Sequence, residues 1–140
     1  MPALYLALRL ETAWLEAQQG FAFKAQPMTL CAYELDVEGC VDLTEPAALA
    51  ALEVTPAMLG CAWERLAADG VEPPTWALAR RLRAEGVAGV RVPSFAPGAT
   101  PEHVNLVLWS WGNGPPHRAR VVDDEGRLPR DDRSWRSEAS

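Results

Sequence analysis

The sequence contains no run of about 18 apolar residues, the length that a membrane-spanning helix requires. Its N-terminus also lacks the charged region, apolar block and cleavage site of a secretory signal peptide. Both absences predict a cytoplasmic protein that makes no membrane contact. The three cysteines, Cys31, Cys40 and Cys61, form no C-x-x-C pair and no disulfide framework. We expect them to be reduced thiols that act as small buried apolar side chains.

Several motifs of enzymes and cofactor sites are also missing. The chain has no G-x-G-x-x-G or P-loop sequence that would cradle phosphates, and no G-x-S-x-G turn of a hydrolase. The two histidines, His103 and His117, belong to no H-x-x-x-H pattern, so no metal site is expected. A dyad of Ser94 with either histidine stays open, because spacing alone does not test it.

Positive charge is scarce. The formal net charge is -6 and the isoelectric point is near 4.9. A direct nucleic-acid partner is therefore not expected, since such proteins need a basic surface that displaces counterions. The length of 140 residues and the apolar content of 49% suit one domain with a packed core. Without repeats or linkers, the chain is predicted to be a single α+β domain over residues 1–130, followed by a polar C-terminal tail at 131–140.

Hydrophobic periodicity divides the chain into short elements. The expected strands span residues 3–7, 28–37, 41–43, 87–92, 104–111, 118–122 and 127–129. The first helix should run from about Leu10 to Gln19 and end at Gly20. The sequence DDEG between the last two strands is typical of a hairpin turn.

Three further helices are expected after threonine caps at Thr44, Thr55 and Thr75. The second of these should carry Trp63 into the core, and the third should bury Leu82. The arginines expected to face solvent on that third helix are Arg80, Arg81 and Arg83.

A group of four side chains could carry chemistry. Thr12 and Glu16 lie one helical turn apart, and Tyr5 lies on the strand before that helix. A carboxylate beside a hydroxyl and an aromatic ring could hold a sugar hydroxyl and stabilise a cation that develops on the sugar. Ser94 ends a strand before a loop. Each residue also has a structural interpretation: Tyr5 as core, Thr12 as a first-turn residue, Glu16 as an exposed helix residue and Ser94 as a turn residue.

An ordered set of motifs spans residues 3 to 129. It comprises Y-L-A-L, E-T-A-x-x-E, D-L-T-x-P, T-W-A-L-A-x-x-L, G-V-x-G-V-x-V-P-S and N-L-V-L-W. This order resembles the RES domain, the toxin family of bacterial Xre/RES toxin–antitoxin pairs.

The resemblance implies a fold similar to ADP-ribosyltransferase toxins, with mixed or antiparallel sheets and several short helices. It also implies an enzyme that consumes NAD as substrate, by phosphorolysis, hydrolysis or ADP-ribosyl transfer to a target protein. Glu16 and Ser94 match the family's catalytic Glu and Ser. Tyr5 matches the aromatic residue that stacks near the nicotinamide, and Thr12 stands where a hydroxyl residue precedes the Glu. The implied partner is an Xre-type antitoxin with a helix-turn-helix.

One departure concerns the family's Arg, which binds the NAD phosphates from a segment upstream of the first strand. In this sequence that segment would fall before Met1, and Arg9 follows the strand instead. We therefore expect weak NAD binding and a tendency to self-associate or to depend on the partner. The first alternative function is a catalytically weak or inactive RES-fold protein that only binds its antitoxin. The second is an unrelated α+β binding module.

Overall fold

The computed structural model describes residues 3–18, 30–60, 66, 68–112, 114 and 116–128. Its strands are β1 (Leu4–Ala7), β2 (Tyr33–Val37), β3 (Cys40–Asp42), β4 (Gly89–Pro93), β5 (Val104–Leu108) and β6 (His117–Val121). Its helices are α1 (Leu10–Gln18), α2 (Pro46–Leu52), α3 (Pro56–Leu59) and α5 (Pro74–Ala84). The predicted α+β class is confirmed.

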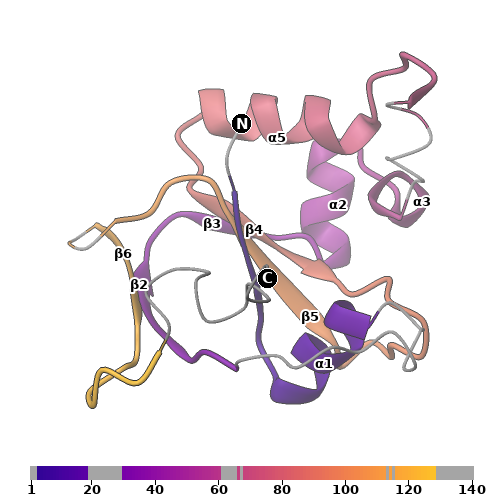
Figure 1. Cartoon of the computed structure of the whole chain (residues 1–140). Coiled ribbons are helices and arrows are strands. Elements are labelled where there is room, and N and C mark those ends of the chain that lie inside the picture. The colour runs from indigo at the N-terminus through magenta and orange to yellow at the C-terminus, as the bar shows by residue number, and fades with distance from the viewer. Residues whose placement is uncertain are drawn as a thin grey trace, which may run out of the picture.

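The strands form two sheets. The larger has the order β1-β5-β4-β3, in which β3 runs parallel to β4 and the other pairs are antiparallel. The smaller is the antiparallel pair of β2 and β6. Figure 1 shows α5 across the top of the molecule, β2 and β6 at the left, and α1 at the bottom.

The larger sheet is covered on both faces. One face packs against helices α2, α3 and α5 through a buried cluster of Leu43, Leu82, Val90 and Trp109. The other face packs against the smaller sheet through Leu106, Leu108 and Ala119. Because side chains alternate along a strand, Val107 and Asn105 of β5 lie on the helical face, while Leu106 and Leu108 lie on the opposite face.

The first strand and helix agree with the sequence prediction to within one residue at each end. Thr55 is also a cap as predicted, since its side chain accepts a hydrogen bond from the Met58 backbone at 3.3 Å. On α5, Leu82 is buried and the three arginines are exposed, as expected. The predicted extension of the Thr55 helix to Trp63 lies outside the described residues, as do Gln19 and Gly20.

Two of the predicted caps are wrong, and proline explains both. Helices α2 and α5 begin with a proline at their first position, so the residue immediately before it becomes the cap: Glu45 for α2 and Pro73 for α5. Thr75 therefore lies within the first turn of α5. The Thr44 hydroxyl donates to the Asp42 carboxylate at 2.5 Å, and this bond is the main reason that the pKa of Asp42 is lowered.

The predicted C-terminal hairpin is also wrong. β6 pairs with β2, which lies some eighty residues earlier in the sequence, as the register of Leu35 with Ala119 shows. A turn does follow β6, but its backbone N–H groups at Arg127 and Leu128 donate to the Asp123 carboxylate. Because these N–H groups bond to a side chain, they do not donate to the backbone of β6 as a second hairpin strand would. In the part of the chain that the structure describes, no strand follows β6.

The cysteines differ from expectation as well. Cys31 is exposed, so its predicted burial is wrong. Cys40 is half-buried on β3, where burial raises the pKa of its thiol. Cys61 lies outside the described residues. No helix within the described ranges has the length and apolar character needed to cross a membrane.

Candidate functional site

Glu16 and Ser94 lie in contact although 78 positions separate them in the sequence. Glu16 belongs to the last half of α1, and Ser94 follows the last residue of β4. The Ser94 hydroxyl donates a hydrogen bond of 2.5 Å to Glu16 Oε1. It also accepts a bond of 3.3 Å from the backbone N–H of Ala96, which fixes its orientation. The structure thus brings together the two residues that sequence reasoning named as catalytic.

Asn105 completes this cluster and was missed by sequence reasoning. Its side-chain amide donates to the same oxygen of Glu16 at 2.6 Å. Asn105 lies near the start of β5, paired with Ala7 of β1 on one side and with Val92 of β4 on the other. Two neutral donors therefore converge on one carboxylate oxygen. Hydrogen bonds to a charged acceptor are among the stronger ones, so the carboxylate is held in one orientation.

A second contact fastens α1 one turn earlier. The Thr12 hydroxyl lies 2.8 Å from Nδ1 of His103, and Thr12 is fully buried at 0% exposure. The backbone carbonyl of His103 in turn accepts the N–H of Ser94 at 2.9 Å. Thr12 and Glu16 therefore tie the same face of α1 to the end of β4, where Ser94 lies, and to the start of β5, where His103 and Asn105 lie. In this arrangement the Thr12 hydroxyl faces protein and has no exposed surface.

The proposed dyad of Ser94 and a histidine is not formed. The single proton of the Ser94 hydroxyl is donated to Glu16, while the His103 side chain contacts Thr12. His117 lies on β6, in the other sheet. In the ranges that the structure describes, no group of three or more His, Cys, Asp or Glu side chains gathers in a way that could hold a metal ion.

Tyr5 lies on the same face of the sheet as Asn105. Tyr5 is paired with Val107 across β1 and β5, and Asn105 is the neighbour of Val107 two positions along the strand. Such diagonal neighbours are about 7–8 Å apart, within reach of an aromatic side chain. Tyr5 is 75% exposed, so its interpretation as a core residue is wrong. Its ring is open to a flat ligand beside the Glu16 cluster.

Charged side chains gather at the start of α1. Arg9, just before α1, lies 3.2 Å from Glu102 and 3.6 Å from Glu11, and all three are exposed. Phe95, next to Ser94, is also exposed and its ring lies against Gly60 at the end of α3. The cluster of Glu16, Ser94 and Asn105 thus lies between α1, the end of β4 and the start of β5.

Comparison with known proteins identifies the family of this chain. No curated protein and no solved structure matches it. The family model of the RES domain, however, matches residues 1–131, which is nearly the whole chain. An unrelated α+β binding module is thereby excluded, and the protein belongs to the RES domain family.

Proposed function

We propose that this protein cleaves the bond between nicotinamide and ribose in NAD. Membership of the RES domain family supports a toxin-like function in general terms, in a family whose members act on NAD. The observation that carries the finer proposal is the Glu16 carboxylate, which is held at one oxygen by Ser94 and Asn105 and flanked on the sheet by the exposed Tyr5.

The chemistry of this bond requires a fixed negative charge. When the C1′–N bond breaks, its electron pair leaves with nicotinamide and the ribose carbon becomes electron-deficient. A carboxylate that is already oriented stabilises this developing cation without reorganising in the transition state. Glu16 has this role in our proposal. Water, phosphate or a protein side chain then attacks the same carbon.

Ser94 and Asn105 orient Glu16 directly, whereas Thr12 acts indirectly by holding α1 in place. Because Thr12 is buried and contacts His103, we assign it to positioning of α1 rather than to direct contact with NAD. The expected role of Thr12 in cofactor binding is thereby refined: its hydroxyl holds the helix that presents Glu16. Successive turns on one face of α1 supply the two residues, which explains their spacing of four.

Tyr5→Ala is expected to raise the KM for NAD by about tenfold with little change in the free energy of unfolding. The exposed ring offers its face to the flat, cationic nicotinamide, and cation–π contacts contribute about 0.5–2 kcal/mol. Steady-state kinetics and urea melts of the variant measure both quantities. Tyr5→Phe keeps the ring and should retain the KM. Loss of stability with unchanged kinetics would assign Tyr5 to folding instead.

Asn105→Leu is expected to lower the kcat for NAD cleavage by about 10- to 100-fold. It removes a hydrogen bond to a charged group, which contributes about 1.5–3 kcal/mol. Asn105→Asp should be at least as damaging, because a second carboxylate beside Glu16 repels the first. Nicotinamide release measured by chromatography gives the rates. An unchanged kcat in both variants would contradict the positioning of Glu16 by Asn105.

The basic test of the function is incubation of the purified protein with NAD. Nicotinamide and the ADP-ribose product should appear in equal amounts. Calorimetric titration with NAD separates binding from turnover. Binding without any product would favour the alternative function, a RES-fold protein that is catalytically inactive and acts through its partner.

We also propose that an Xre-type antitoxin covers the Glu16 cluster, because an enzyme that drains NAD must be inhibited in its own cell. Co-expression with the adjacent gene and size-exclusion chromatography should give a complex with reduced NAD turnover. A monomer that elutes alone with unchanged turnover would argue against this partner.

A further inference from the structure

Arg83 differs from the other arginines of the described ranges. Each of the others lies within salt-bridge distance of a carboxylate; these are Arg9, Arg80, Arg81, Arg91, Arg118, Arg120 and Arg127. Arg83, near the end of α5, has no such partner among the residues that the structure describes. Its guanidinium therefore meets no carboxylate of the described residues, although the chain as a whole carries a net charge of -6.

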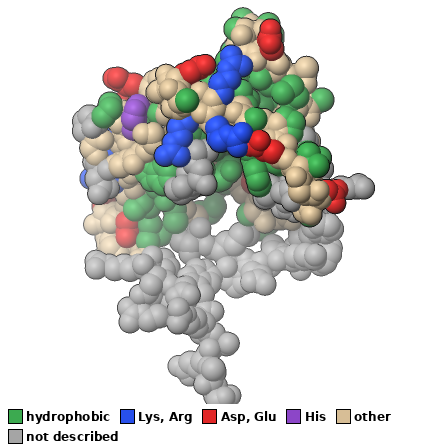
Figure 2. Space-filling model, turned by 90° about the horizontal axis from the view of Figure 1, so that it is seen from above, with side chains coloured by type: hydrophobic (Ala, Val, Ile, Leu, Met, Phe, Trp, Pro, Cys, Tyr) green, Lys and Arg blue, Asp and Glu red, His purple; other side chains and the backbone are tan. Residues whose placement is uncertain are grey.

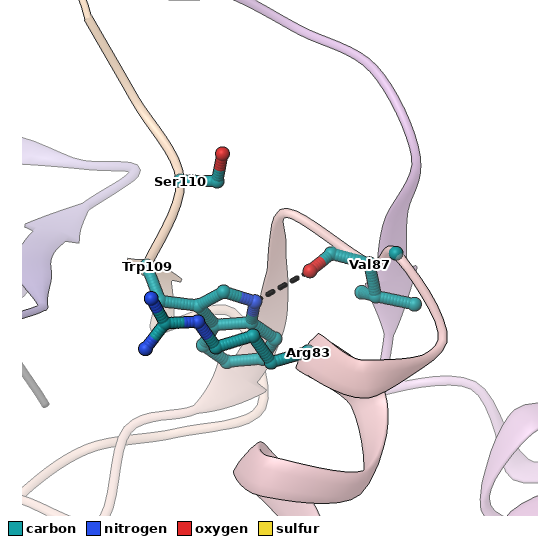
Figure 3. A pocket seen from close by; sticks show the side chains of 5 residues that line it. Arg83, Val87, Trp109 and Ser110 are labelled. Atoms are coloured by element: carbon teal, nitrogen blue, oxygen red, sulfur yellow. Dashed lines mark hydrogen bonds between the residues drawn. The ribbon is translucent and has the colours of Figure 1, made fainter.

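Arg83 lines a hollow of about 240 Å³ together with Gly86, Val87, Trp109 and Ser110. Figure 3 shows that Arg83 reaches it from the last turn of α5, whereas Trp109 and Ser110 come from the chain just beyond β5. Gly86 adopts a φ of +85°, which lets the chain turn sharply after α5 and leaves the hollow open. Figure 2 looks down on the side where α5 lies, and blue arginine side chains gather there.

The polar side chains of the hollow are hydrogen-bond donors. The indole N–H of Trp109 is already used, because it donates to the Val87 carbonyl at 2.5 Å. Its indole ring, only 7% exposed, is held as a rigid wall. The guanidinium of Arg83 meets no carboxylate of the described residues and can contact a ligand, whereas Figure 3 shows the Ser110 hydroxyl pointing away from it. A cationic fork beside a flat apolar wall matches a planar anion.

The geometry points to a binding site for a carboxylate group at this hollow, carried by a small planar acid or by an acidic side chain of a peptide. The carboxylate would accept two parallel bonds from Arg83. Pockets for drug-sized ligands have volumes of about 300–1,000 Å³. A hollow of about 240 Å³ therefore suits a ligand of a few atoms beyond the carboxylate and is too small for a dinucleotide.

This site is separate from the Glu16 cluster. Asn105 lies at one end of β5 and Trp109 follows the other end, four residues away. At about 3.3 Å per residue, the two positions are about 13 Å apart along the strand. The proposal therefore does not depend on the proposed NAD cleavage.

The test is an NMR titration that follows the indole N–H resonance of Trp109, which is assigned by its absence in Trp109→Phe. Benzoate is the probe, and benzamide is the neutral control of the same shape. Benzoate should shift the resonance saturably in the millimolar range, while benzamide should not. Arg83→Gln should weaken benzoate binding by about tenfold or more, because it removes the charged donor pair. Arg127→Gln makes the same change of charge at a remote exposed position and should retain binding.

Two further arms distinguish the source of the carboxylate. An amidated triglutamate peptide that binds at least tenfold more tightly than benzoate, and that also requires Arg83, assigns the site to an acidic partner segment. Weaker binding of the peptide assigns it to a free small acid. Equal binding of benzoate to the wild type and to Arg83→Gln would overturn the proposal. Competition between NAD and benzoate for Arg83 would overturn it as well, since the hollow would then belong to the NAD site.

Discussion

Glu16→Gln is expected to slow NAD cleavage by about 10²–10³-fold while leaving the free energy of unfolding nearly unchanged. The substitution removes the negative charge that stabilises the electron-deficient ribose carbon, and loss of a single electrostatic stabiliser typically has an effect of about this size. The fold should tolerate the change because the amide oxygen of Gln can still accept the bonds from Ser94 and Asn105. Nicotinamide release and urea melts measure the two quantities.

The matched control is Glu11→Gln, which makes the same chemical change on the same helix. Glu11 is exposed and lies near Arg9. Because it precedes Glu16 by five residues, it lies about 140° around the helix from the face that contacts Ser94 and Asn105. Its contribution through an exposed ion pair should be below about 1 kcal/mol, and NAD cleavage should continue at the wild-type rate. If Glu16→Gln and Glu11→Gln were equally active, the catalytic assignment of Glu16 would be wrong.

Local patterns in the sequence are sufficient to predict the element that presents Glu16. Leu4 to Ala7 form a short strand and Leu10 to Gln18 a helix as expected, because these signals lie within a few neighbouring residues. The spacing of Thr12 and Glu16 also predicts that both lie on one face of the helix. The structure agrees, since both contact the segment around β5.

The partners of that face could not be predicted in the same way. Asn105 and His103 reach α1 only because β5 pairs with both β1 and β4, and this pairing joins residues some ninety positions apart. Asn105 stands in the N-L-V-L-W motif, where its alternation with Val107 places it on the helical face of the sheet. That alternation is a usable signal, but it gains meaning only once the strand order is known.

The wrong predictions of strand pairing and of helix starts have a similar origin, because contacts outside the local pattern decide both. The β6 strand was predicted in a local hairpin, whereas its hydrogen bonds go to β2 in a separate sheet. Strand pairing is decided by the apolar face that must be buried, here Ala119 beside Leu106 and Leu108, and not by turn residues alone. Helices α2 and α5 begin at a proline, so the nearby threonines are not their N-caps.

Trp109→Ala is expected to destabilise the fold by about 3–5 kcal/mol, the usual range for removal of a buried tryptophan. Sequence reasoning assigned a core role to Trp63, which lies outside the described residues, so that role stays a prediction. Trp109 is 7% exposed, and it packs with Leu82 and Val90 in the cluster beneath the helices. The substitution also removes the donor that satisfies the Val87 carbonyl, which adds to the loss of packing.

Urea melts of Trp109→Ala and Trp14→Ala provide the measurement and its control. Trp14 lies on α1 and is 46% exposed, so its replacement should change stability by less than about 1 kcal/mol. Trp109→Phe keeps an aromatic wall but no N–H group, and should fall between the two. A stability loss in Trp109→Ala no larger than that in Trp14→Ala would contradict the packing of α5 on the sheet through this residue. The same result would also contradict the carboxylate site beside Arg83, because that site requires the Trp109 ring to be held rigidly by packing.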